Sequence, residues 1–239
     1  MNKDYKIIDN LIPTSYQNFI DDILNTNSFP WYFGTSINYN PNNIKYEDEN
    51  VTDAPGFGHL AFSPETNSEN SFIFPHIKPI LYFLEEKENI VIKEIKRVRI
   101  RRTTQIPGHT LKKYTPPHVD LSQIEDYYSL VYYVDDSDGD TVLFKNKFDE
   151  KSKQTVLFKK PEEYIRVPPK KGRGFFFKGK IFHSGNCPVN YKKRTIINFD
   201  FTIKEIKQTN TKTPSEQLQD QLEPITNSIP DSWSDLETV

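Results

Sequence analysis

Several features that would define a class of protein are scarce in this chain. Its 239 residues include one cysteine, Cys187, which excludes an intrachain disulfide and an all-cysteine zinc site. A single thiol suits a reducing compartment, so we expect an intracellular, cytoplasmic protein. No run of about 18 apolar residues occurs, and no basic start followed by an apolar segment indicates a signal peptide. We therefore expect no membrane-spanning helix.

An excess of charge of one sign is also missing. The chain has 31 basic and 33 acidic residues and a net charge of -2, so no overall field attracts it to nucleic acid or to a membrane surface. Aromatic residues, in contrast, are plentiful, with 17 Phe and 13 Tyr. Their broad rings pack well on pleated surfaces, so the composition favours β structure. Nothing in the sequence predicts an oligomeric state.

Two helices are predicted in the N-terminal part. The apolar residues of the first recur with helical spacing: Tyr16, Phe19, Ile20, Ile23 and Leu24. Thr14 or Ser15 is its expected N-cap, and residues 25–30 end it. The second is expected over 76–87, with its first turns perturbed by Pro79 because proline has no amide hydrogen. The first helix has one apolar face that must be buried, and we expect a sheet to cover it.

Most of the remaining pattern predicts short strands. The clearest is 96–103, where arginines alternate with Val98 and Ile100. The expected strands are 5–11, 57–62, 96–103, 127–134, 141–145, 154–158, 174–177, 181–184 and 195–202. Short strands separated by turn residues favour a sandwich or barrel. A cupin-like jelly roll of two facing antiparallel sheets, with the N-terminal helices supporting it, fits best.

A metal site is predicted from the histidines. The chain has five: His59, His76, His109, His118 and His183. In an extended segment, His118 and Asp120 point to the same side, and His183, at a strand end, is the expected third ligand. Two histidines and one carboxylate form a facial triad, which leaves other coordination positions open. Zinc hydrolases use the same donors, so the triad alone does not name the metal.

Arg194 adds a second requirement. It lies 11 residues after His183, at the start of the next predicted strand, so the intervening loop returns the chain beside the metal site. A guanidinium can hold a carboxylate with two parallel hydrogen bonds, and a dicarboxylate that also chelates the metal is the expected ligand. By alternation Ile196 and Asn198 face the same side, and we expect Asn198 to add a hydrogen bond.

These residues carry a resemblance to a known family. The order His118-Val119-Asp120, His183-Ser184-Gly185 and Arg194 resembles the 2-oxoglutarate- and iron(II)-dependent dioxygenase superfamily. Segments 107–120, 130–141 and 194–201 resemble its prolyl-4-hydroxylase-like branch, which has many small bacterial and phage members. The likeness covers about 92–203.

The resemblance implies a double-stranded β-helix fold that uses iron(II), 2-oxoglutarate and O₂. It implies that His118, Asp120 and His183 ligate iron and that Arg194 pairs with the far carboxylate of 2-oxoglutarate. It also implies that Tyr133, on the neighbouring strand, points at that carboxylate. The implied reaction couples oxidative decarboxylation of 2-oxoglutarate, to succinate and CO₂, with hydroxylation of a substrate C–H bond.

Three function classes remain open. The first is hydroxylation of a protein or peptide side chain, as in prolyl hydroxylases. The second is an oxygenase acting on a small molecule or a nucleobase, although the alkylation-repair branch has an arginine where this chain has Asp200. The third is a non-redox jelly-roll metal protein, either a zinc hydrolase or a binding module, in which Arg194 would have no role.

The arginines of the segment 96–103 also have two interpretations. Arg97, Arg99 and Arg101 share one face of the predicted strand. They form either a solvated or carboxylate-paired strand face, or a charged wall at the barrel mouth that selects an anionic substrate. The sequence leaves both open.

We expect one oxygenase domain over 1–204. Within it, 1–91 forms a helical buttress with substrate-side loops, and 92–204 forms the β-helix core. Residues 205–239 are polar and read as a C-terminal tail, with a possible capping box at 213–216.

Overall fold

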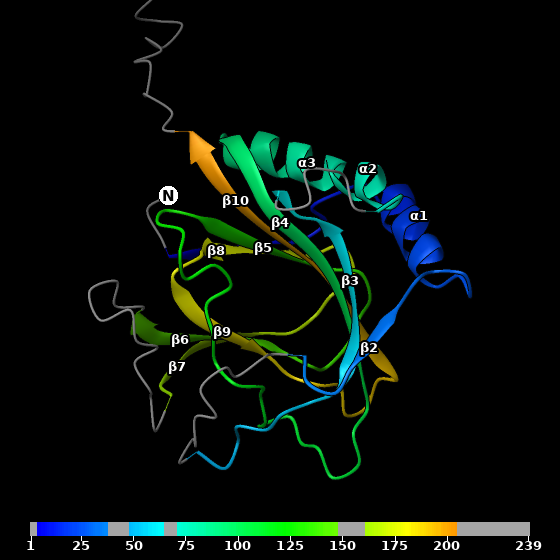
Figure 1. The fold of residues 1–239 in the computed structure, drawn as a ribbon, viewed down its shortest axis with the longest axis vertical. Coiled ribbons are helices and arrows are strands. Elements are labelled where there is room, and N and C mark those ends of the chain that lie inside the picture. The colour runs from blue at the N-terminus through cyan, green and yellow to red at the C-terminus, as the bar shows by residue number, and fades with distance from the viewer. Residues whose placement is uncertain (1–3, 38–47, 65–70, 148–160, 205–239) are drawn as a thin grey trace, which may run out of the picture. The chain divides into compact units, whose positions relative to one another are not determined.

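The computed structural model describes residues 4–37, 48–64, 71–147 and 161–204, and Figure 1 shows how their helices and strands are arranged. The predicted strand over 154–158 and the predicted tail over 205–239 lie outside these described residues.

Two antiparallel sheets make up most of the described chain. The larger has seven strands in the order β1-β8-β5-β10-β4-β3-β2, and the smaller has three in the order β7-β6-β9. Their bounds are β1 Tyr5–Ile8, β2 Tyr32–Gly34, β3 Gly56–Phe62, β4 Val91–Thr104, β5 Tyr128–Tyr133, β6 Thr141–Lys147, β7 Glu163–Val167, β8 Gly174–Lys178, β9 Ile181–Gly185 and β10 Lys193–Lys204. The predicted fold class, mainly β with two antiparallel sheets, is confirmed.

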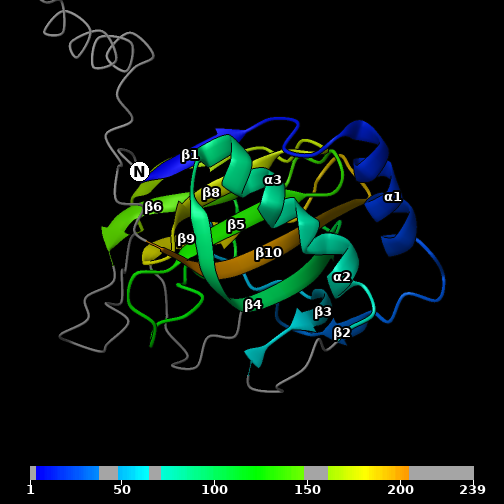
Figure 2. The same cartoon turned by 90° about the horizontal axis from the view of Figure 1, so that it is seen from above.

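The helices cover one face of the larger sheet (Figures 1 and 2). They are α1 (Thr14–Leu24), α2 (Phe74–Ile77) and α3 (Pro79–Glu88). Pro79 separates α2 from α3, because its ring cannot continue the helix of the preceding turn. No helix in the described part of the chain is long and apolar enough to cross a membrane.

The predicted N-cap of the first helix is wrong. Thr14 already lies inside α1, and the cap is Pro13, whose carbonyl accepts from the amides of Tyr16 and Gln17 at 2.9 and 3.0 Å. Neither Thr14 nor Ser15 is needed there because proline, with its fixed extended entry into the helix, takes the flanking position. The predicted end at Asn25 is confirmed.

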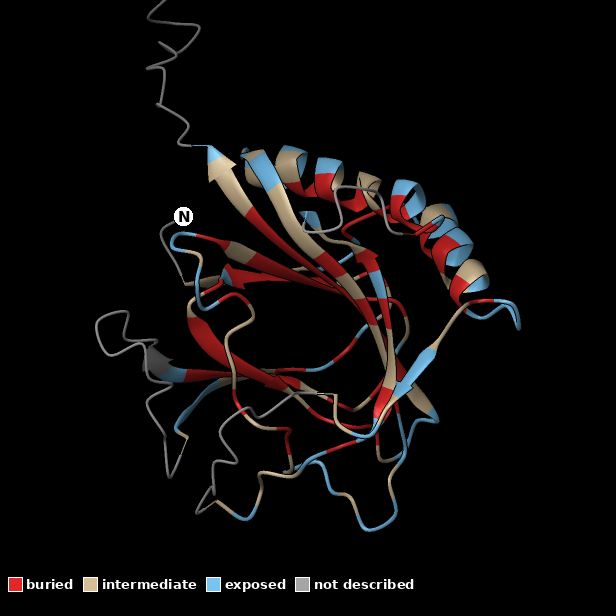
Figure 3. Cartoon of the chain, viewed as in Figure 1, coloured by how far each residue is buried: buried red, intermediate tan, exposed pale blue. Residues whose placement is uncertain are grey.

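Residue alternation divides the large sheet between two cores, and Figure 3 shows that much of its central strands is buried. One side packs under the helices, and its sheet members include Val98, Ile100, Leu130, Tyr132, Phe176, Ile197, Phe199 and Phe201. The other side faces the small sheet and includes Val131, Tyr133, Phe175, Phe177 and Ile196. Because neighbours along a strand point to opposite faces, the run Phe175-Phe176-Phe177 contributes to both cores. The interior between the sheets also receives polar side chains of β4 and β10.

Two central strands determine where those polar side chains stand. β10 pairs with β4 along its whole length, with Arg194 opposite Thr103, Ile196 opposite Arg101 and Asn198 opposite Arg99. The small sheet lies across the interior, and β6 pairs with β9 so that Leu143 stands opposite His183. One strand of this sheet, β7, was not among the strands predicted from the sequence. The site is built between the two sheets.

Candidate metal centre

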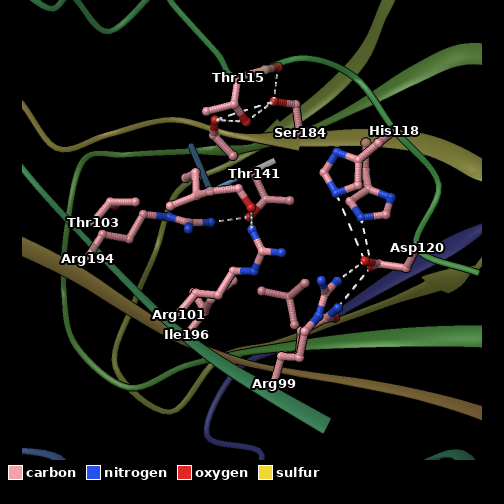
Figure 4. Close-up of a pocket in the computed structure, with 15 residues that line it drawn as sticks. Arg99, Arg101, Thr103, Thr115, His118, Asp120, Thr141, Ser184, Arg194 and Ile196 are labelled. Atoms are coloured by element: carbon pink, nitrogen blue, oxygen red, sulfur yellow. Dashed lines mark hydrogen bonds and ion pairs between the residues drawn. The ribbon is translucent and has the colours of Figure 1, made fainter. Parts of the chain in front are cut away.

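A pocket opens between the sheets at the level of the predicted ligands (Figure 4). Its lining combines residues from β4, β5, β6, β9 and β10 with residues of the segment that follows β4 and with Ile37. They are Ile37, Arg99, Arg101, Thr103, Thr115, His118, Asp120, Val131, Thr141, His183, Ser184, Gly185, Arg194, Ile196 and Asn198. Five of the six residues predicted to hold metal or cosubstrate therefore line one pocket. The sixth, Tyr133, does not.

The two predicted histidine ligands are joined by their backbones. His118 and His183 form an isolated antiparallel bridge, with amide-to-carbonyl hydrogen bonds of 3.0 and 2.9 Å. Their rings lie 4.6 Å apart between centroids. The two hydrogen bonds fix the separation of the two residues. The imidazoles are therefore neighbours although the residues are 65 positions apart in the sequence.

Asp120 completes the cluster. Its carboxylate lies 3.1 Å from Nε2 of His183 and 4.0 Å from Nε2 of His118. One donor atom from each of the three residues lies within 4.8 Å of the others. The Asp120 side chain is 1% exposed. Two imidazole nitrogens and a buried carboxylate oxygen at this spacing provide the donor set of a two-histidine, one-carboxylate metal site.

Both imidazoles are oriented for ligation. Nδ1 of His118 lies 3.1 Å from the carbonyl of Pro116, and Nδ1 of His183 lies 3.2 Å from the carbonyl of Ile181. When Nδ1 donates to a carbonyl, Nε2 keeps its lone pair for a metal, the usual outer support of metal-binding histidines. Burial, and then the neighbouring His183, lower the pKa of His118 to about 3, so the ring is neutral at physiological pH. The residues present therefore fit a divalent metal such as iron(II).

Asp120 also receives several donors from the protein. Arg97 Nη2 donates to Oδ1 at 2.7 Å, Arg99 contacts the same oxygen, and Asn198 Nδ2 donates to Oδ2 at 2.9 Å. Although burial opposes ionisation, Arg99 and the other donors hold the pKa of Asp120 well below its usual range. The carboxylate is thus kept charged, as a metal ligand must be.

Arg97 is shared between two carboxylates. It contacts Asp120 and also Asp200, to which Nε and Nη2 donate at 3.1 and 2.9 Å. Asp200 is fully buried, and Ser129 donates to its other oxygen at 2.8 Å. Burial, and then the charge of Asp120, raise the pKa of Asp200 to about 6. Asp200 therefore acts on the metal ligand through Arg97.

Arg194 lies at the other end of the pocket. It is 4% exposed, and its Nη2 donates to Oγ1 of Thr141 at 2.7 Å. Its Nε is buried and has no hydrogen-bond partner among the described residues. A buried guanidinium that faces a pocket with an unpaired donor is a site for an anion, because an unmet buried donor costs about 1–3 kcal/mol.

Tyr133 lies beside Arg194 but is not among the residues that line the pocket. Its hydroxyl donates to Thr141 Oγ1 at 2.7 Å, and its ring lies 5.8 Å from the guanidinium carbon of Arg194. It thus supports Thr141 and Arg194 from outside the pocket. Asn198 lines the pocket, but its amide hydrogens point to Asp120, while its Oδ1 is buried without a partner in the described part of the chain.

Thr141 is the residue of this site that sequence reasoning missed. It follows the turn 138–140 and begins β6, and its hydroxyl accepts from both Arg194 and Tyr133. Alternation along 141–145 could have placed it on the inner face, but nothing in the sequence pairs it with Arg194. The other histidines lie elsewhere: His59 contacts Pro30 and Ser71, and His109 contacts Asn186.

The arginine face is inside the molecule. Arg97 and Arg99 pair with the buried carboxylates described above, so for these two the first interpretation holds in its carboxylate-paired form, and the charged-wall interpretation stays open. Arg101 lines the metal pocket and donates to the carbonyl of Ile37.

Similar solved structures place this architecture among known folds. No family model and no curated protein matches the sequence. A 2OG-Fe(II) oxygenase-family oxidoreductase from Burkholderia pseudomallei is 13% identical, with a TM-score of 0.53 over 83% of this chain and 85% of that chain. A prolyl hydroxylase from Trichoplax adhaerens, in complex with a hypoxia inducible factor peptide fragment, is 13% identical, with a TM-score of 0.51 over 84% of each chain.

A third similar structure is a non-heme alpha ketoglutarate dependent epimerase, SnoN, from nogalamycin biosynthesis. It is 9% identical, with a TM-score of 0.52 over 83% of this chain and 78% of that chain. Likeness at such low identity concerns the fold, whereas the metal-binding geometry comes from this chain's own residues. The chain has the double-stranded β-helix fold of the 2-oxoglutarate- and iron(II)-dependent oxygenases, with a His118, Asp120 and His183 facial triad inside it.

Proposed function

We propose that this protein is an iron(II)- and 2-oxoglutarate-dependent dioxygenase that hydroxylates a C–H bond. The observation that carries the proposal is that the triad and the buried Arg194 line the same pocket. A facial triad leaves open positions that a chelating ligand can fill, and Arg194 supplies the counter-charge for a dicarboxylate. Neither feature alone is specific, but together they match a single cosubstrate.

Each residue then has a role. His118, Asp120 and His183 would hold iron(II), which when bound to 2-oxoglutarate supplies the oxidation of a C–H bond by O₂ with release of succinate and CO₂. Arg194 binds the far carboxylate, and Thr141 fixes the guanidinium that does so. Ile196 lines the same wall and packs against the methylene groups between the two ends of the cosubstrate. Asn198 holds the carboxylate of Asp120 in place.

A zinc hydrolase would use the same triad, but it has no use for Arg194. The guanidinium is buried, is placed by two side chains and keeps an unpaired donor. A buried cation with an unpaired donor lowers the stability of the fold unless an anion binds to it. A zinc hydrolase, in which Arg194 binds nothing, would give no reason for this loss of stability.

For the substrate, we propose a side chain of a protein or peptide. The similar Trichoplax structure holds a peptide fragment, which supports this class. A small molecule is the alternative, supported by the similar epimerase of nogalamycin biosynthesis. The alkylation-repair type of nucleobase oxygenase is disfavoured, because Asp200 faces Arg97 and Asp120 rather than contributing a cation. We also propose that residues 1–204 act as one catalytic domain.

Uncoupled turnover tests the proposal. Protein loaded anaerobically with iron(II) receives 2-oxoglutarate and then O₂, and succinate is followed with time. We expect slow succinate release that is abolished in His183→Ala and falls sharply in Arg194→Ala. His76→Ala is the matched control, because His76 is an exposed histidine on the outer helix α2.

Binding must be checked beside turnover. Addition of 2-oxoglutarate should change the absorption spectrum of the iron(II) protein, since chelation alters the metal's ligand field. If neither succinate nor a spectral change is seen, the oxygenase proposal is abandoned in favour of a zinc enzyme or a binding module. Succinate that persists in Asp120→Ala would be equally damaging.

A further inference from the structure

We propose that Arg99 and Arg101 form a subsite that binds an anionic group, a carboxylate or a phosphate, of the prime substrate. This inference rests on the proposed oxygenase function and names the chemistry of its substrate. It is carried by the position of the two side chains between the metal pocket and a neighbouring groove, and by the charge that the interior holds.

Arg99 and Arg101 line both the metal pocket and a groove beside it. A groove with a cavity volume of about 340 Å³ adjoins the metal pocket, whose own cavity volume is about 50 Å³. Arg99, Arg101 and Ile37 line both, whereas Arg194 and the triad line only the metal pocket. Figure 4 shows both guanidinium groups directed into the pocket. A substrate in the groove therefore meets these two arginines before it reaches the metal.

The groove has room for a small molecule or for one side chain of a larger substrate. Its floor is β3, where Gly58 stands opposite Arg101 in register. A side-chain carbon at Gly58 would have no neighbour within 4 Å, so the floor is open. Tyr32 and Leu60 line the groove and are 68% and 42% exposed. A cavity of this size and mixed character suits a small molecule or one side chain.

The charge in the interior calls for an anion beyond the cosubstrate. On the inner faces of β4 and β10 and beside them stand four arginines, Arg97, Arg99, Arg101 and Arg194, against two carboxylates, Asp120 and Asp200. Within this set of described residues the arginines outnumber the carboxylates by two. Iron(II) and the 2-oxoglutarate dianion cancel each other, so the surplus persists in the loaded enzyme. A substrate with one or two negative charges balances it.

Arg99 and Arg101 stand in a different setting from Arg97. Arg97 is held by Asp120 and Asp200, while Arg99 keeps a buried Nε without a partner among the described residues. Burial, and then the charges of Arg99 and Arg97 against the attraction of Asp120, lower the pKa of Arg101 to about 9. A cation in that setting gains more from an incoming oxyanion than a solvated surface arginine does.

The test measures anion binding to protein that cannot turn over. Zinc(II) replaces iron(II), because it has no redox chemistry, and 2-oxoglutarate is present at saturation. Phenyl phosphate, benzoate and the uncharged benzamide are titrated by calorimetry. We expect one site that binds phenyl phosphate or benzoate but not benzamide; the better of the two anions identifies phosphate or carboxylate as the substrate's group.

Variants assign the site. Arg101→Gln should weaken anion binding by about tenfold or more, and Arg101→Lys should recover part of it, since it restores the charge without the planar fork. Lys93→Gln is the matched control, because it removes one positive charge from the exposed part of the same strand. Circular dichroism checks that each variant is folded.

Four results would overturn the inference. They are equal anion affinity in Arg101→Gln, competition between the anion and 2-oxoglutarate, loss of anion binding from metal-free protein, and equal binding of benzamide. The second would assign Arg101 to the cosubstrate and the third would assign the probe to the metal. Failure of the oxygenase proposal is detected in a different experiment, the uncoupled turnover assay, as the absence of succinate. In that case the titration of metal-free protein would still show whether Arg99 and Arg101 bind an anion.

Discussion

Arg194 donates a 2.7 Å hydrogen bond to the hydroxyl of Thr141, which lies 53 residues earlier in the chain. The same hydroxyl accepts from Tyr133, so Thr141 joins a strand of the small sheet to two strands of the large one. All three side chains are buried. The guanidinium proposed to bind the cosubstrate is thus positioned by Thr141 directly and by Tyr133 through Thr141.

Thr141→Val should therefore weaken 2-oxoglutarate binding while keeping the shape of the core. Loss of one hydrogen bond to a charged group costs about 1–2 kcal/mol, so KM for 2-oxoglutarate in the uncoupled reaction should rise at least about fivefold. Thr202→Val is the control, because the Thr202 hydroxyl has no partner among the described residues. An unchanged KM in Thr141→Val would remove Thr141 from this role.

Arg97→Met should destabilise the protein strongly. Asp120 and Asp200 are buried, and Arg97 is the cation that both contact. Breaking such a pair leaves uncompensated buried charge and costs about 3–5 kcal/mol in the free energy of unfolding. Urea unfolding of the metal-free protein measures this, with Lys93→Met as the exposed control on the same strand.

The double variant Arg97→Met, Asp200→Leu separates charge from packing. If the loss comes from the orphaned carboxylate, the second substitution should recover part of the stability, since it removes that carboxylate. A double variant that is less stable than Arg97→Met alone would instead indicate that the polar contacts of Asp200, including that with Ser129, dominate.

Gly139→Ala should harm both stability and cosubstrate binding. A methyl group there would lie 2.5 Å from the carbonyl oxygen of Asn186 and 2.9 Å from Cδ of Arg194. The carbonyl oxygen of Asn186 belongs to the backbone and cannot move aside easily. We therefore expect the free energy of unfolding to fall by about 1–3 kcal/mol and KM for 2-oxoglutarate to rise. Gly58→Ala is the matched control for stability, since its methyl group would enter open space. Thermal unfolding should leave Gly58→Ala near the wild-type midpoint.

Asp138 should make a pH-dependent contribution to stability. It accepts from the amides of Val189 and Asn190 at 2.9 and 2.8 Å, and so fastens the loop between His183 and Arg194. Desolvation by burial raises the pKa of Asp138, but the hydrogen bonds from Asn190 and Val189 outweigh this effect. The pKa of Asp138 is therefore lowered from 3.8. A lowered carboxyl pKa means that the stabilisation is fully present above about pH 4.

Below that pH the contribution of Asp138 is lost as the carboxyl takes up its proton. Asp138→Asn should therefore have a lower midpoint of thermal unfolding than wild type at pH 7, and the difference should shrink as the pH falls below 3.8. Midpoints at several pH values test this. A difference that stays constant down to pH 2 would show that the charge of Asp138 is not what holds the loop.

Local sequence patterns were enough to predict which residues face the interior. Residue alternation fixes which side of each strand is apolar, and it placed Val98 and Ile100 under the helices and Arg97, Arg99 and Arg101 on the opposite face. The pair His118 and Asp120 was predictable for the same reason. The order of the motifs, with His183 and Arg194 after it, predicted the fold, which is confirmed, and led to the proposal of 2-oxoglutarate as the cosubstrate.

The contacts that complete the site were decided only by the tertiary structure. Local pattern says that a side chain faces inward but not which other strand it meets, because strand order and register are set by packing of the whole sheet. Thr141 meets Arg194, Asp200 meets Arg97 and Tyr133 turns to Thr141 through pairings of residues far apart in sequence. The sequence by itself determined the candidate metal ligands, because their spacing and alternation are local. The register of β4, β10 and the small sheet decided which side chains hold them in place.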